Sequence, residues 1–176
     1  MTRSMTADAY GALTNPTTLT MQRLLPARID RVWAYLTDGD LRAKWFAAGD
    51  MPTSVGDAIE LVWRNNDLTN PPGRIPEGMG AENRMLTRIT ELDPPHTLAI
   101  GWGDGEVRFV LVEQGEDVLL TLTHTGIPDR ARLLSFAPGW HMHFDILRAR
   151  LTGTTPEPFW DGIARLREDY IARLPA

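Results

Sequence analysis

Large apolar side chains recur at helical spacing along residues 133–151. At 100° per residue they share one face, made of Leu133, Phe136, Trp140, Phe144, Leu147 and Leu151. The opposite side carries Met142, Arg148 and Arg150. The pattern therefore predicts a helix with one face on an apolar surface. Pro138-Gly139 lies inside it and is expected to break or kink the helix, because proline removes a backbone hydrogen bond, so that the pocket-facing part would begin near Pro138.

Short segments with alternating apolar positions precede this helix. They predict strands over residues 17–25, 57–64, 84–92, 97–102, 106–113 and 117–125. Asp104-Gly105 is typical of a type I′ hairpin turn, and Gln114-Gly115-Glu116 of another tight turn. Short loops between consecutive strands predict an antiparallel meander.

Three further helices complete the predicted secondary structure. Pro26 opens a helix whose inner face is Ile29, Val32, Trp33 and Leu36. After a cap at Asp38, residues 41–46 form a second short helix that places Leu41, Trp45 and Phe46 inward. Residues 156–174 form a last amphipathic helix with Phe159, Ile163, Leu166, Tyr170 and Leu174 on one face.

Residues 65–80 are rich in Asn, Pro and Gly and predict a long loop. We expect this loop to fold over the cavity mouth near Trp45 and Phe46, with Leu68, Ile75 or Met79 pointing inward. The competing interpretation is a surface excursion that does not touch the pocket.

The order of these elements predicts an α+β fold in which a long helix covers an antiparallel sheet and encloses a small-molecule groove. The expected organisation is one domain with three parts. Residues 1–16 form a loose tail, residues 17–153 the ligand-binding domain, and residues 154–176 a helical extension packed on it.

Composition excludes several classes of function. The chain has 176 residues, a net charge of −5 and no cysteine. This charge argues against nucleic-acid binding, and the absence of thiols excludes disulfides and thiolate metal sites. No apolar stretch is long enough for a membrane span, and residues 1–16 lack the apolar core of a signal peptide. We therefore expect a cytoplasmic protein.

His124 is the first candidate for chemistry. It continues the alternation of Val118, Leu120 and Leu122 and therefore points to the same face. It could hold a ligand oxygen or act as an acid or base inside the cavity. The favoured alternative is a strand-end histidine bonded to a nearby turn, because one buried polar group normally needs only a partner.

His141 and His143 form an H-x-H motif, but on a helix they lie 200° apart and cannot share one ion. His141 and Asp145 do share a face, yet a zinc site needs a third ligand. We therefore predict no metal and no cofactor, and His143 is the better candidate for the pocket wall. The three serines lie in no nucleophile motif.

Aromatic side chains supply the remaining candidates, although core packing explains most buried aromatics. Trp63, Trp102 and Phe109 are expected to line the concave sheet opposite Trp140 and Phe144. Three charged strand residues lie out of phase with the apolar strand positions, and we expect their side chains to be solvated: Glu60, Arg84 and Arg108. The full set of candidate ligand-binding residues is Trp45, Phe46, Trp63, Trp102, Phe109, His124, Trp140, His143, Phe144 and Leu147.

Several segments of the sequence resemble those of one known superfamily. LPARIDRVWAYLTDGDLRAKWFAAG followed by VGDAIEL, then RITELDPPHTLAIGW, VLLTLTHTGI and PGWHMHFDILRARLTG, resemble the START/polyketide-cyclase-like (SRPBCC) superfamily. Within it, they are most similar to the branch named after the activator of the heat-shock-protein-ninety ATPase. The resemblance covers residues 17–153. It implies the helix-grip fold, a curved antiparallel sheet wrapped around a long C-terminal helix.

The superfamily includes lipid carriers, hormone receptors and cyclases that use the same cavity, so the fold does not fix the function. Our first hypothesis is noncatalytic binding of a small hydrophobic or aromatic molecule. The second is a cyclase, dehydratase or hydrolase that uses His124 or His143 as general acid or base. The third is a protein-interaction or stress-related module that binds a protein, such as its own copy, through an exposed sheet edge or the terminal helix. The terminal helix is more apolar than an exposed helix needs at Phe159, Trp160 and Tyr170, and the competing interpretation is that these residues pack against the chain's own sheet. The co-chaperone domain of the name-giving activator is not expected in this chain.

Overall fold

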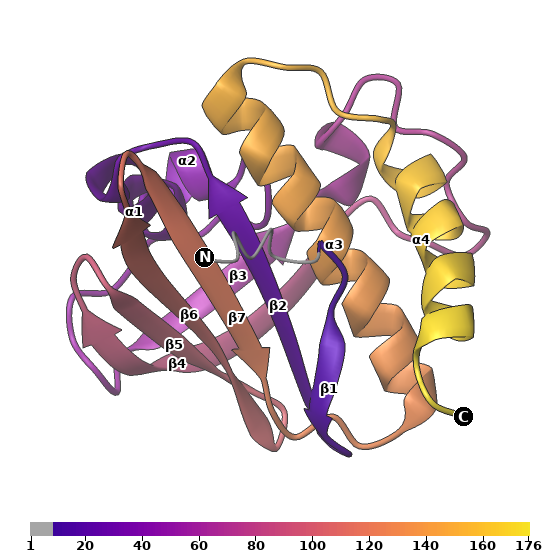
Figure 1. Cartoon of the computed structure of the whole chain (residues 1–176), viewed down its shortest axis with the longest axis horizontal. Coiled ribbons are helices and arrows are strands. Elements are labelled where there is room, and N and C mark those ends of the chain that lie inside the picture. The colour runs from indigo at the N-terminus through magenta and orange to yellow at the C-terminus, as the bar shows by residue number, and fades with distance from the viewer. Residues whose placement is uncertain (1–8) are drawn as a thin grey trace, which may run out of the picture.

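The computed structural model describes residues 9–176 as one curved sheet that wraps around a long helix (Figure 1). The strands are β1 (Ala12–Asn15), β2 (Thr18–Leu25), β3 (Ala58–Trp63), β4 (Asn83–Asp93), β5 (Thr97–Trp102), β6 (Gly105–Gln114) and β7 (Asp117–His124). All neighbours are antiparallel, in the order β1-β2-β7-β6-β5-β4-β3. The expected α+β helix-grip fold is confirmed.

The helices are α1 (Ile29–Thr37), α2 (Gly39–Arg42), α3 (Arg130–Thr152) and α4 (Phe159–Arg173), with a short 3-10 helix η1 (Asn65–Asp67). α1 and α2 follow β2 and lie at one end of the sheet (Figure 1). The Asp38 carboxylate caps α2 by accepting from the Asp40 and Leu41 amides, as the sequence predicts. α2 ends at Arg42, earlier than expected, although Trp45 and Phe46 still point inward and are buried.

The strand prediction holds because alternation along a strand reflects burial on one face. On β7, Val118, Leu120, Leu122 and His124 are all buried while the residues between them are partly exposed. The β5–β6 turn differs by one position. Its two residues are Gly103 and Asp104, with Gly103 at a positive φ of 56° that favours glycine.

Strand β1 is a correction to the expected loose tail. Ala12 and Leu13 pair with Thr20 and Leu19 of β2, so part of residues 1–16 belongs to the sheet. Four residues at a sheet edge are too short for a clear alternating pattern. The remainder of that predicted tail, residues 1–8, lies outside the described residues.

α3 is also a correction, because it runs unbroken through Pro138. Proline has no N–H, so the Leu134 carbonyl loses its usual partner in the helix. The Arg167 guanidinium of α4 donates to this carbonyl at 3.2 Å. A side chain from the neighbouring helix thus compensates for the missing backbone bond.

α3 is buried on two sides, because the sheet covers one and α4 covers the other. Met142, expected on the solvent side, is fully buried under α4. The two helices approach closely at Gly162, where an added Cβ would clash with the Met142 sulfur. Phe159, Trp160 and Tyr170 of α4 are buried within the chain and offer no apolar surface to a second copy.

Candidate functional site

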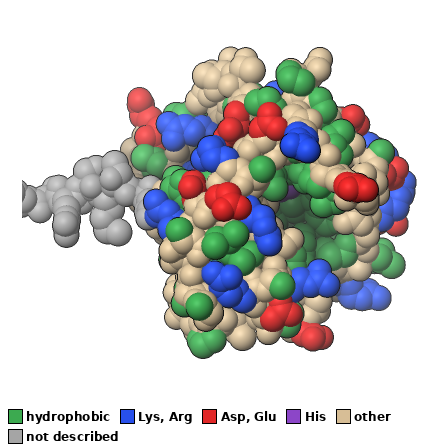
Figure 2. Space-filling model, turned by 90° about the vertical axis from the view of Figure 1, so that its right-hand side faces the viewer, with side chains coloured by type: hydrophobic (Ala, Val, Ile, Leu, Met, Phe, Trp, Pro, Cys, Tyr) green, Lys and Arg blue, Asp and Glu red, His purple; other side chains and the backbone are tan. Residues whose placement is uncertain are grey.

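An open groove of about 400 Å³ lies between α3 and the ends of β3, β4 and β5. Figure 2 shows a hollow lined by hydrophobic side chains, with basic and acidic side chains on the surface around it. The groove is lined by Phe46, Trp63, Asn65, Asn83, Arg84, Met85, Trp102, Arg132, Ser135, Phe136, Gly139, Trp140 and His143.

α3 supplies one wall of this groove through a single face of the helix. The lining positions recur at intervals of three or four, as in 132, 136, 140 and 143 or in 135, 139 and 143, which places them in one row along the helix. They are Arg132, Ser135, Phe136, Gly139, Trp140 and His143. The row begins in the first turn of α3, after the Asp129 side chain caps the helix by accepting from the Arg132 amide at 2.8 Å.

The aromatic rings around the groove form one connected cluster. Phe46 contacts Trp63, Trp140 and His143, with ring centroids 5.4, 5.0 and 5.3 Å apart. Trp102 contacts Trp63 at 5.7 Å and Trp140 at 5.6 Å. Tilted and edge-to-face arrangements are the favoured geometries of aromatic pairs. The groove therefore has walls of mutually packed aromatic rings.

His143 lies at the α4 end of the groove and is held by the backbone. Its Nδ1 is 2.7 Å from the Trp45 carbonyl oxygen, which can only accept, so Nδ1 carries the proton. The neutral ring then leaves Nε2 as a hydrogen-bond acceptor. Burial lowers the pKa of His143 to about 4, against the opposing effect of the Trp45 bond.

His124 is a core residue and not part of the groove lining. Its Nδ1 accepts from the Trp140 indole at 3.1 Å, and burial lowers its pKa to about 4. The structure differs here from both interpretations of the sequence, because the partner is an α3 tryptophan and neither a turn nor a ligand site. The bond fixes the Trp140 ring that forms the groove wall.

The sequence-predicted site residues do not all line the groove. Phe46, Trp63, Trp102, Trp140 and His143 line the groove. Trp45 and Phe109 instead border an interior void of about 10 Å³, too small for a ligand, which Phe46 also contacts. Phe144 and Leu147 are fully buried core residues that border neither space.

Sequence reasoning missed most polar groups of the groove. Arg84 is exposed, as the sequence predicts, but it also lies at the rim of the groove, where it pairs with Glu60 at 2.8 Å and with Glu82. Arg132 and Asn65 were not considered. Arg132 could have been found, because it stands one helical turn before Phe136 and two before Trp140 on the same face.

The loop between β3 and β4 does not cover the groove as a lid. Leu68 points inward and is buried, but Ile75 and Met79 are 40% and 52% exposed. The Trp160 indole donates to the Asn66 side chain at 2.8 Å, and Arg150 donates to the Leu68 carbonyl at 2.6 Å. The beginning of the loop is therefore fixed to α3 and α4, and only Asn65 of residues 65–80 lines the groove.

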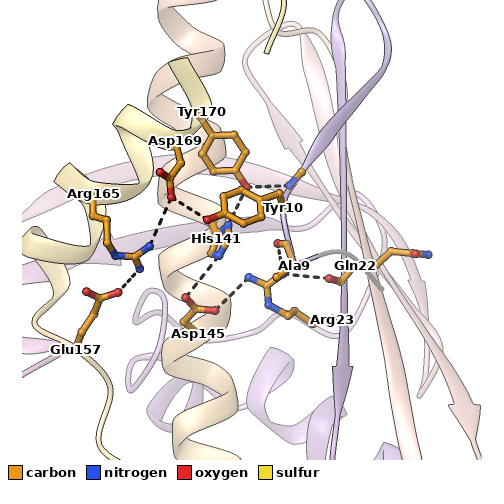
Figure 3. Close-up of polar contacts among 11 residues, drawn as sticks. Ala9, Tyr10, Gln22, Arg23, His141, Asp145, Glu157, Arg165, Asp169 and Tyr170 are labelled. Carbon is orange, nitrogen blue, oxygen red and sulfur yellow. Dashed lines mark hydrogen bonds and ion pairs between the residues drawn. The ribbon is translucent and has the colours of Figure 1, made fainter. Parts of the chain in front are cut away.

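Among the described helix histidines, His141 has a carboxylate beside it (Figure 3), and it is not among the residues that line the groove. Its Nε2 is 3.6 Å from Asp145, which pairs with Arg23 at 3.1 Å, and its Nδ1 is 2.9 Å from the Tyr170 hydroxyl. Burial raises the pKa of Asp145, and it raises the pKa of Tyr170 to about 12. This cluster joins α3 and α4 to the sheet edge.

No group of three or more possible metal ligands occurs within residues 9–176. In the same part of the chain, no helix has the length and apolar character required to span a membrane.

Comparison with known families identifies the branch. The family described as "Activator of Hsp90 ATPase homolog 1-like protein" matches residues 26–152. The chain belongs to this family. This match confirms the resemblance to the activator-homologue branch that the sequence segments indicate. None of the curated proteins matches the chain.

Solved structures of similar proteins share this activator-homologue fold. A Bordetella parapertussis protein solved by NMR is 37% identical, with a TM-score of 0.80 over 97% of this chain and 93% of that one. CalU16 from Micromonospora echinospora is 24% identical, with a TM-score of 0.65 over 92% and 95%. DynU16, from the dynemicin biosynthetic locus, is 19% identical, with a TM-score of 0.61 over 82% of this chain and 51% of that one. The last two show the fold alone.

Proposed function

We propose that this protein binds a small, flat hydrophobic or aromatic molecule in the groove between α3 and the ends of β3, β4 and β5, without catalysing a reaction on it. The observation that carries the proposal is a groove of about 400 Å³ with connected aromatic walls. This volume and this lining are typical of small-molecule sites. Membership of a family whose members often bind hydrophobic ligands supports it.

The histidines favour binding over acid–base catalysis. An effective general base has a pKa near the working pH, and an acidic partner often orients it. His143 and His124 have pKa values lowered to about 4. Their hydrogen-bond partners are a carbonyl and an indole. Neither is suited to take a proton from a ligand at neutral pH.

Other surface depressions lack these walls. One of about 420 Å³ lies between the C-terminal half of α3 and the turn before α4. It is lined by threonines and by charged residues that include Asp145, Arg148 and Glu157, and it has no aromatic side chain. It offers a flat apolar molecule nothing to stack against.

Gly139 permits a direct test, because a Cβ added there would meet no atom within 4 Å. We expect Gly139→Leu to fill the groove without disturbing the fold. Removing a glycine from the middle of α3 should even stabilise the protein, by up to about 1 kcal/mol. Gly139→Ala is the matched control, since it gives the same helix benefit with little loss of groove volume.

The measurement is quenching of tryptophan fluorescence by a series of planar aromatic compounds, with thermal unfolding in parallel. We expect wild type and Gly139→Ala to bind, and Gly139→Leu to have lost saturable binding while unfolding at the same or a higher temperature. Equal binding by all three proteins would show that the groove is not the ligand site. A cytoplasmic location and a homodimer remain predictions, to be checked by cell fractionation and light scattering.

A further inference from the structure

The two ends of the groove differ in chemistry, and this difference defines the ligand more closely. Arg132 and His143 mark the ends of the α3 row and are eleven residues apart. At 1.5 Å per residue this separation is about 16 Å along the helix axis. Between them the row presents Phe136, Gly139 and Trp140, an apolar middle section.

The Arg132 end is positively charged. Arg132 is exposed, and its guanidinium forms no hydrogen bond or ion pair with any residue of the described chain. It stands in the first turn of α3, where the helix dipole already favours a negative charge. Although the chain carries a net charge of −5, none of the described residues that line the groove is an Asp or Glu. The groove is therefore complementary to an anion at this end.

The opposite end offers acceptors. The Asn65 side-chain oxygen is buried, and no described residue donates a hydrogen bond to it. Buried polar atoms without a partner are rare. Because Asn65 is a partly exposed residue of the groove lining, a rotation of its side chain would present this oxygen to a donor in the groove. His143 adds the Nε2 lone pair, because its Nδ1 proton is used by the Trp45 carbonyl. Both residues line the groove.

We propose that the groove binds an elongated, planar aromatic acid, with its acidic group at Arg132 and a hydroxyl or amine donor at Asn65 and His143. This rests on the proposed binding function and specifies its ligand class and orientation. The rings lie over Gly139, where the helix carries no side chain, and against Trp102 and Trp140. Glu60 and Glu82 already pair with Arg84, so the unpaired Arg132 determines the preference for the acid.

The test uses four probes that differ only at their ends. They are 4′-hydroxybiphenyl-4-carboxylate, its analogue without the hydroxyl, and the carboxamide counterpart of each. Dissociation constants are measured by calorimetry for wild type, Arg132→Gln, Asn65→Leu and the control Arg148→Gln. Arg148 is a suitable control because it is exposed on the same helix, outside the groove, and forms no ion pair with the described residues.

Each variant should affect only the probes that carry its partner group. We expect Arg132→Gln to weaken both carboxylates about fivefold, the effect of one exposed charge pair, and to leave the carboxamides unchanged. Asn65→Leu should weaken both hydroxylated probes about fivefold through one lost hydrogen bond, and not the other two. Arg148→Gln should behave as wild type.

The results that would overturn the proposal are of two distinguishable kinds. If wild type binds acids and carboxamides equally, or Arg132→Gln weakens both equally, the preference for an acid at Arg132 is wrong while the proposed binding function stands. If no probe binds saturably to wild type, both the ligand class and the proposed function fail.

Discussion

His143 and His124 show how strongly burial controls the chemistry of a single residue here. Each imidazole is surrounded by aromatic rings and has one fixed hydrogen bond. A charged imidazolium would lose its solvation in both places, and the bond from Trp140 to the His124 Nδ1 requires an unprotonated nitrogen. Both residues are therefore built into the fold as neutral rings.

Protein stability should fall in mild acid as a consequence. The pKa of each histidine is lowered from 6.5 to about 4 on folding, so between these pH values the unfolded chain binds more protons than the folded one. The stabilisation is complete above about pH 6.5 and is lost as the pH falls towards 4. Each residue should contribute a slope of about 1.4 kcal/mol per pH unit within that window. The free energy of unfolding, determined with urea at intervals between pH 4 and 8, gives this slope.

Asparagine variants provide the control for this pH dependence. His143→Asn retains a donor for the Trp45 carbonyl, and His124→Asn retains an acceptor for the Trp140 indole, but neither side chain titrates. Each variant should reduce the pH dependence of the free energy of unfolding by the contribution of one histidine. A profile that is unchanged in both variants would show that other groups cause the acid sensitivity.

At the scale of elements, α3 depends on a residue that lies outside it. Pro138 leaves the Leu134 carbonyl without its helix partner, and Arg167 supplies the missing donor at 3.2 Å. We expect Arg167→Met to destabilise the protein by about 1–2 kcal/mol, because a carbonyl at a helix–helix contact would lose its hydrogen bond. In a Pro138→Ala background the same substitution should cost much less, since alanine restores the backbone donor.

Chemical denaturation of the four proteins in this cycle measures the coupling. If Arg167→Met costs the same with proline or alanine at position 138, the guanidinium acts through packing and not through the Leu134 carbonyl.

The same contact explains what sequence reasoning could and could not predict about the elements. Periodicity gave most strands and the apolar faces of the helices, because these reflect burial against the nearest layer. It predicted a break or kink at Pro138, since the compensating donor, Arg167, is 29 positions further along the chain. It placed Met142 towards solvent, because the second covering layer, α4, meets α3 only in the folded chain.

The groove was harder to predict, because it depends on the whole molecule. An aromatic side chain on the concave side can fill the interior, as Trp45 does, or face the groove, as Trp102 does. The hydrophobic pattern is the same in both cases, and only the relative position of α3 and the sheet edge distinguishes them. Polar residues of the groove such as Asn65 lie outside any apolar pattern.

At the scale of the whole molecule, a buried polar cluster joins three layers (Figure 3). The Tyr170 hydroxyl of α4 accepts from the Gly11 amide beside β1 at 2.8 Å and bonds the His141 ring of α3 at 2.9 Å. Asp145 of α3 pairs with Arg23 of β2. One side chain, Tyr170, thus connects the sheet edge with both C-terminal helices.

We expect Tyr170→Phe to destabilise the protein by about 1–3 kcal/mol, because a buried amide and an imidazole nitrogen would both lose their partner. Tyr35→Phe is the matched control, since the Tyr35 hydroxyl is also in a buried residue but has no hydrogen bond within the described chain. Denaturant unfolding gives the difference between the two variants, and hydrogen exchange at the Gly11 amide reports the loss locally. Exchange at Gly11 should accelerate in Tyr170→Phe alone, because its acceptor has been removed. Equal unfolding energies in both variants, with Gly11 still protected, would mean that packing of the rings holds the layers together and that the hydroxyl network adds nothing to it.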